Sequence, residues 1–187
     1  MNPSARLEAI QLAKQRIAQR PVFVDTETTG TGKNDVLIEI AIIDHDGSVL
    51  VDTLVKPYRK ISPDAYKVHK ISDDMVKSAP PWSQVWAQVE SALSGRVVVM
   101  YNAEFDLRIM RQSHTYNQMY WRHPKGTTFF DIMPLYAQFY GEWNPRRASY
   151  RWQSLDAAQK QCGLTLPNTH RAKDDTLLTR ALLHYIA

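Results

Sequence analysis

The chain has 187 residues, 44% of them hydrophobic, which is enough for one globular domain with a full core. Its net charge of +4 favours an anionic partner. Its single cysteine, Cys162, excludes an internal disulfide framework and is typical of a reducing compartment. The chain has neither an apolar run of transmembrane length nor the apolar core of a signal peptide, so we expect a cytoplasmic protein with no membrane partner.

The N-terminal segment has apolar residues at helical spacing, which predict an amphipathic helix over 4–19. Ser4 is its expected cap, and Leu7 is expected on its packed side. A proline at 21 ends the helix. We therefore divide the chain into an N-terminal helical extension, residues 1–20, and a main domain, residues 21–187.

The main domain alternates apolar strands with amphipathic helices, a pattern typical of an α/β fold. Strands are predicted at 22–25, 36–44, 48–55, 96–100 and 127–130. Helices are predicted at 63–69, 73–77 and 82–93, then in a segment ending at 119, and at 132–140, 154–162 and 172–185. The first three strands, joined by short turns, predict an antiparallel meander, and the strand over 96–100 is expected to be buried and parallel.

Two carboxylates stand at the end of the first strand. Asp25 and Glu27 are two positions apart, so both side chains lie on the same face of the strand. Like charges this close repel unless a cation lies between them, and hard oxygen ligands suit Mg²⁺ or Mn²⁺. The alternative is a polar strand end that leads into a glycine turn. Glu39, inside the next strand, is interpreted as a structural carboxylate with a local partner.

Further acidic residues follow at two other junctions. Asp106 comes after the strand over 96–100, near the start of a helix. Asp174 and Asp175 lie near the start of the last helix, and helical spacing does not decide which of the two borders the core. His170 precedes this helix by a few positions and is a candidate general base near neutral pH.

Three segments carry a resemblance to a known family. The sequences DTETTG, YNAEFD and HRAKDD, in this order and separation, resemble the three exonuclease motifs of the DnaQ-like, or DEDDh, 3′–5′ exonuclease family. The resemblance extends over nearly all of the chain from residue 21 onward. It implies an RNase H-like α/β fold with a five-stranded mixed sheet flanked by helices. It also implies an enzyme that releases nucleoside 5′-monophosphates by a two-metal mechanism.

The resemblance implies roles for particular residues. Two divalent ions, Mg²⁺ or Mn²⁺, would be held by Asp25, Glu27, Asp106 and Asp175. Asp25 would bridge both ions, and His170 would be the general base. The match selects Asp175 over its neighbour at 174.

Four other residues match positions that contact the terminal nucleotide in similar enzymes. They are Thr28, His69, Asn102 and Phe105. His69 falls in a His-Gly-Ile element of the family, in which Lys70 replaces the glycine here. Two alternatives stay open, because His69 could be a loop residue bonded to nearby backbone and Phe105 could be packed in the core.

The segment from 141 to 151 is predicted to be a loop in which basic and aromatic residues alternate. Arg146, Arg147, Tyr150 and Arg151 could hold a single strand there, although such a cluster can equally be a solvated surface.

The function that these patterns predict is a metal-dependent 3′–5′ exonuclease acting on DNA, at single-stranded or frayed ends. A 3′–5′ exoribonuclease is the first alternative, and a non-catalytic nucleic-acid-binding module is the second. The partner is a nucleic acid with a free 3′ end. Only twelve residues follow Asp175, which favours a freestanding nuclease over a polymerase-tethered subunit. A homo-oligomer stays open.

Overall fold

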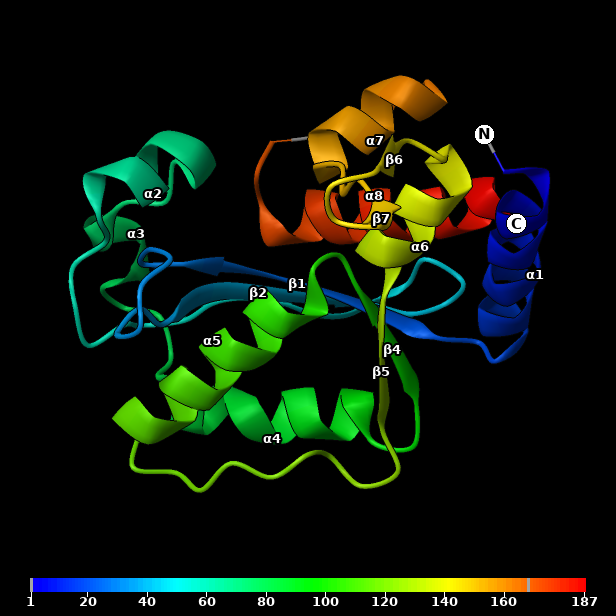
Figure 1. Ribbon diagram of the computed structural model, residues 1–187. Coiled ribbons are helices and arrows are strands. Elements are labelled where there is room, and N and C mark those ends of the chain that lie inside the picture. The colour runs from blue at the N-terminus through cyan, green and yellow to red at the C-terminus, as the bar shows by residue number, and fades with distance from the viewer. Residues whose placement is uncertain (1, 168) are drawn as a thin grey trace.

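A five-stranded mixed sheet forms the centre of the protein (Figure 1). The computed structural model describes residues 2–167 and 169–187. The strands are β1 (Val22–Thr28), β2 (Leu37–Ile43), β3 (Val49–Leu54), β4 (Val97–Met100) and β5 (Thr128–Asp131), in the order β3-β2-β1-β4-β5. β1 and β2 pair antiparallel, as do β2 and β3, whereas β4 pairs parallel with both β1 and β5. The predicted meander, the parallel fourth strand and the fold class are confirmed.

Helices cover both faces of the sheet (Figure 1). One face carries α4 (Trp82–Leu93) and α5 (Ala103–Tyr116). The other carries α1 (Pro3–Ala18), α6 (Ile132–Tyr140), α7 (Leu155–Cys162) and α8 (Ala172–Ile186). The short helices α2 (Pro63–His69) and α3 (Asp73–Val76) lie beyond one end of the sheet. In the described part of the chain, no helix combines the length and apolar character needed to cross a membrane.

The alternation of side chains along β1 assigns its residues to two separate cores. Val22 and Val24 pack in the core beneath α4 and α5, whereas Phe23 packs with α1, α6 and α8. Because the alternation has a period of two, Asp25 points toward the α8 side and Thr26 toward the α5 side. Polar side chains at the C-terminal end of β1 therefore lie on both faces of the sheet.

The N-terminal helix differs from its prediction in cap and packed face. It begins at Pro3, and the Asn2 side chain, not that of Ser4, is its cap, because Asn2 Oδ1 accepts a hydrogen bond from Ser4 N at 3.1 Å. Its buried residues are Ala9 and Ala13, with Ala5 at the edge, whereas the predicted core residue Leu7 is 59% exposed. The alanines let α1 pack against α6 and α8, which the apolar spacing alone did not indicate.

The prediction of a loop over 141–151 is wrong in part. A small antiparallel hairpin forms there, with β6 (Trp143–Asn144) and β7 (Ser149–Tyr150) paired through the register Trp143↔Tyr150. Strands of two residues are too short to show the alternation from which strands are recognised in a sequence.

Candidate active site

Three carboxylates from two elements meet at the C-terminal end of β1. Asp25, Glu27 and Asp175 each offer an oxygen, and these oxygens all lie within 4.8 Å of one another. The first two share a face of β1, and the third comes from the first turn of α8, which packs on that face. Asp174, the neighbour in sequence, instead accepts a hydrogen bond from the Thr169 hydroxyl.

Burial and mutual repulsion raise the pKa of these acids. The pKa of Asp25 lies well above its usual value because the group is desolvated and because Asp106 and Glu27 repel its charge. Burial, followed by repulsion from Asp175, raises the pKa of Glu27 to about 9. Burial also raises the pKa of Asp175 to about 6. Such a cluster favours cations, because a bound cation offsets both costs.

Asp106 reaches the site from the opposite face of the sheet. It is buried in the first turn of α5, and its Oδ1 accepts a hydrogen bond of 2.6 Å from Thr26 Oγ1. Burial raises the pKa of Asp106 to about 7, although the Thr26 hydrogen bond opposes the shift. Asp106 is not one of the three acids whose oxygens lie within 4.8 Å of one another, but its charge acts on Asp25.

His170 lies beside the cluster. Its Nδ1 is 3.9 Å from Asp175 Oδ2, and its Nε2 is 3.9 Å from Asp156 Oδ2 in the first turn of α7. The backbone at His170 has a positive φ of 51°, where the chain turns into α8. The imidazole is partly exposed, so solvent reaches it, while two carboxylates flank it.

An ion pair between the buried Glu39 and the partly exposed Arg171 fixes the start of α8. Both oxygens of Glu39 accept hydrogen bonds from Arg171 Nε at 3.0 Å, and Arg171 Nη2 also contacts Glu39. Glu39 Oε2 also accepts a hydrogen bond from Ala172 N at 3.0 Å. Glu39 is a structural carboxylate, as predicted, but its partner is 132 positions away and not local. Because Glu39 is paired with Glu27 across β1 and β2, the ion pair holds α8 directly against the acidic cluster.

A cavity of about 500 Å³ opens next to the carboxylates. Its lining includes Glu27, Thr28, His69 and Phe105, together with parts of α2 and of the loop after β1. The Phe105 ring lies 5.1 Å from the Arg108 guanidinium and partly packs on the core below. Asn102 is not part of this lining. It is an exposed residue with φ of 66° before α5, and its backbone N–H donates to Asp131.

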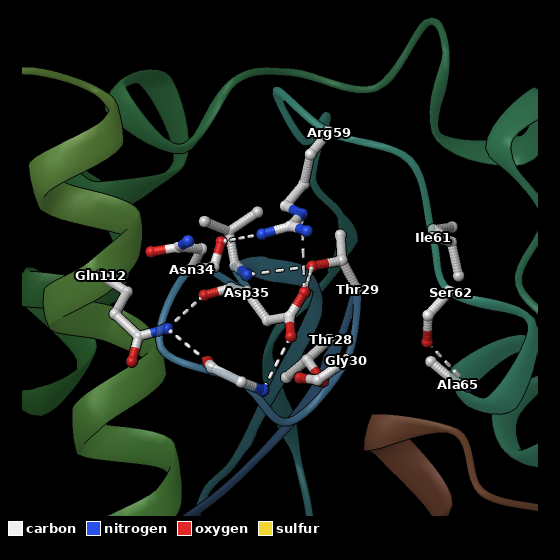
Figure 2. Close-up of polar contacts among 12 residues, drawn as sticks. Thr28, Thr29, Gly30, Asn34, Asp35, Arg59, Ile61, Ser62, Ala65 and Gln112 are labelled. Atoms are coloured by element: carbon white, nitrogen blue, oxygen red, sulfur yellow. Dashed lines mark hydrogen bonds and ion pairs between the residues drawn. The ribbon is translucent and has the colours of Figure 1, made fainter.

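The wall formed by the loop after β1 is braced from within (Figure 2). Asp35 accepts hydrogen bonds from Thr29 Oγ1 at 2.8 Å and from Gly32 N at 2.7 Å, and Arg59 pairs with it at 3.6 Å. A Cβ at Gly30 would lie 2.7 Å from Asp35 Oδ2. A side chain at position 30 would therefore have to displace the Asp35 carboxylate from its hydrogen bonds within the loop.

His69 has backbone partners on both ring nitrogens. Its Nδ1 accepts from Ile71 N at 3.0 Å, so its Nε2 carries the proton and donates to Thr28 O at 3.1 Å. Burial lowers the pKa of His69, in keeping with a neutral ring. Lys70 adopts the left-handed conformation, with φ of 60°, that a glycine would favour. The backbone shape of the element is thus kept despite the replacement, and His69 shapes the cavity by holding Thr28.

Three residues of the site were not predicted from the sequence. Thr26 lies between Asp25 and Glu27, and strand alternation could have placed it on the opposite face, where it meets Asp106. Arg171 adjoins His170 in sequence, but nothing in the pattern linked it to Glu39. Asp156 gave no signal beyond its position in a first helical turn.

Comparison with known proteins places the chain in a family. A family model described as "Exonuclease" (RNase T) matches residues 22–183. The protein named "Uncharacterized exonuclease CP81" of Escherichia phage 186 is 33% identical over 184 residues, which cover 95% of this chain and 93% of that protein. The chain belongs to the RNase T/DnaQ-like exonuclease family.

Two further relatives define the type of enzyme. The DNA polymerase III subunit epsilon of Treponema pallidum is 29% identical over 170 residues, covering 86% of this chain and 75% of that protein. A solved structure of Exonuclease X in complex with 5′ overhanging duplex DNA is 27% identical with a TM-score of 0.64, covering 88% and 89% of the two chains. The protein is an enzyme of the DEDD-type 3′–5′ exonuclease class.

Proposed function

We propose that the enzyme removes nucleoside 5′-monophosphates from the 3′ end of DNA, at single-stranded or frayed ends, with the help of divalent metal ions. The observation that carries the proposal is the convergence of Asp25, Glu27 and Asp175 within 4.8 Å, beside His170. DNA is favoured as substrate because one relative is named as a DNA polymerase subunit and another structure was solved with DNA.

The donor set fits divalent cations. It consists of hard carboxylate oxygens, and the buried Asp175 Oδ1 has no hydrogen-bond partner among the described residues. In this proposal Asp25, Glu27, Asp106 and Asp175 would hold two Mg²⁺ or Mn²⁺ ions. The bound ions supply Lewis-acid stabilisation of the charge that develops on the phosphodiester.

The side chains around the acids have separate tasks in the proposed reaction. His170, as neutral imidazole, takes the proton of the attacking water, and the carboxylates on either side stabilise the imidazolium that results. The 500 Å³ cavity receives the terminal nucleotide, where Phe105 offers an aromatic face to the base. Thr28 and His69 form the wall of that cavity, and Asn102 lies at the start of the helix beside it.

A digestion panel tests the proposal. The substrates are single-stranded DNA, duplex DNA with a recessed or mismatched 3′ end, and single-stranded RNA, all labelled at the 5′ end and incubated with Mg²⁺, Mn²⁺ or EDTA. We expect a ladder that shortens from the 3′ end of DNA only with metal. Asp25→Ala and His170→Ala should lower the rate by orders of magnitude, whereas the exposed control Asp74→Ala should not. A ladder on RNA alone would replace DNA by RNA, and metal-independent cleavage would refute the proposal.

A further inference from the structure

The hairpin β6–β7 is the most basic aromatic surface that the function has not yet used. A groove of about 760 Å³ runs along it, and its lining includes Arg146, Arg147, Arg151, Tyr150 and Trp152. No acidic residue belongs to this lining. The groove therefore presents a cationic surface with aromatic rings beside it.

The turn of the hairpin directs two of these cations outward. The Asn144 side chain accepts a hydrogen bond from the backbone N–H of Arg146, at 3.1 Å to Oδ1. The Asn144 carbonyl accepts another from the backbone N–H of Arg147, at 3.2 Å. Both arginine side chains are exposed, and across residues 2–167 and 169–187 neither guanidinium has a hydrogen-bond or ion-pair partner. Arg151 differs, because it pairs with Glu142 at 3.3 Å. Two positive charges are thus available to a ligand.

The aromatic residues suit bases that are not stacked in a duplex. Trp152 is 67% exposed, so most of its ring surface is accessible to a ligand. Tyr150 is half-buried and is held by an edge contact with Trp143 at 5.2 Å between ring centres. Arginines that contact phosphates, next to aromatic rings that stack on bases, are the means by which proteins hold single strands.

The segment that follows the hairpin connects it to the surroundings of the acidic site. The Tyr101 hydroxyl, just after β4 and five positions before Asp106, donates a 2.7 Å hydrogen bond to Gln153 O, immediately after the hairpin. Three residues further on, Asp156 lies 3.9 Å from His170. The hairpin lies on the same side of the sheet as α8 (Figure 1). A strand whose 3′ end enters the site can therefore continue onto the hairpin.

We propose that the groove of hairpin β6–β7 binds the single-stranded DNA segment that lies 5′ of the nucleotide being removed. The inference rests on the proposed function for the identity of the ligand. Arg146 and Arg147 contact its phosphates, and Trp152 stacks on one of its bases. The hairpin holds the substrate strand outside the catalytic centre, so it acts on long substrates and not on the shortest ones.

Binding without catalysis tests this directly. Fluorescence anisotropy in EDTA measures the affinity for an oligothymidylate of about 20 nucleotides at several salt concentrations. The double variant Arg146→Ala/Arg147→Ala should bind about tenfold more weakly at moderate salt, and its salt slope should be shallower by about 1.4, or 0.7 for each lost phosphate contact. Trp152→Ala should weaken binding about fivefold or more.

The matched control is a second exposed basic and aromatic surface beyond the end of α5. Arg122→Ala/Lys125→Ala removes the same charge, and Tyr120→Ala removes a ring that is 82% exposed. Both controls should bind within twofold of the unmodified protein. Equal losses in the hairpin and control variants, or unchanged binding in the hairpin variants, would overturn the proposal, as would tighter binding of duplex DNA or RNA than of single-stranded DNA.

Hydrolysis distinguishes failure of the hairpin from failure of the active site. With Mg²⁺, the hairpin double variant should keep the unmodified rate on a dinucleotide and lose rate on the long oligonucleotide at limiting substrate. An equal loss on both substrates would contradict the hairpin role. If no substrate is hydrolysed while binding still depends on the hairpin, the proposed function fails and the binding surface stands.

Discussion

Replacing one of the clustered carboxylates should stabilise the metal-free protein while it abolishes activity. Asp25→Asn keeps the size of the side chain and removes the charge that faces Glu27 and Asp175. At the 4.8 Å separation, each ionised pair costs about 3 kcal/mol for an effective dielectric constant of about 20. Because burial and repulsion raise the pKa of Asp25, either its charge or its bound proton destabilises the folded protein relative to the unfolded chain at pH 8, and an asparagine removes this cost.

The expected gain at pH 8 in EDTA is therefore about 1–3 kcal/mol in the free energy of unfolding, less than the full pair energy because an amide is also desolvated. For a chain of this size, that raises the melting temperature by roughly 2–12 °C. The gain should shrink at pH 5, where the pKa of Asp175, about 6, leaves that group mostly protonated. Mg²⁺ should stabilise the unmodified protein and have little effect on Asp25→Asn.

Thermal unfolding monitored by intrinsic fluorescence measures the melting temperature of each variant in four conditions, namely EDTA or Mg²⁺ at pH 5 and at pH 8. Asp74→Asn, which removes an exposed charge in α3, is the matched control and should change stability by no more than about 0.5 kcal/mol. The reasoning is refuted if Asp25→Asn melts below the unmodified protein in EDTA at pH 8. It is also refuted if Mg²⁺ raises both melting temperatures equally.

Three further outcomes follow from the same contacts. The melting temperature of the metal-free protein should fall from pH 5 to pH 9. The reason is that folded Asp106 and Glu27, with pKa values of about 7 and 9, hold protons that the unfolded chain has released over this range. A melting temperature that rises with pH would contradict this. Thr26→Val should lower the exonuclease rate about tenfold or more, because it removes the hydrogen bond that holds Asp106. Thr26→Ser keeps the hydroxyl and should restore the rate. Equal rates for the valine variant and the unmodified protein would refute the positioning role. Glu39→Ala should lower the free energy of unfolding in urea by about 1–3 kcal/mol, because it removes the acceptor of the Arg171 and Ala172 N hydrogen bonds; an unchanged midpoint would show that these bonds contribute nothing.

The sequence predicted the sheet well because its strands are long enough to show their pattern and the turns between them are short. It predicted the grouping of Asp25 with Glu27 because alternation along a strand is a local rule. It could not predict the Glu39 contact with Arg171, since a strand-interior acid gives no sign of a partner 132 positions away. The face of α1 was also mispredicted, because close helix packing selected small alanines over larger apolar residues such as Leu7.

The acidic site and the hairpin that we propose to hold the substrate strand differ in how many strands support them. β1 is paired on both sides and fully buried up to Val24, so the acids at its end are held on a rigid element. The register shifts between Glu27 and Thr28, and the Thr28 carbonyl accepts a hydrogen bond from His69. The hairpin β6–β7, in contrast, has two residues in each strand and joins no other sheet. If the hairpin holds the substrate strand as proposed, sequence changes there would alter which strands are held without moving the acids, whereas a one-residue shift in β1 would turn both acids to the wrong face.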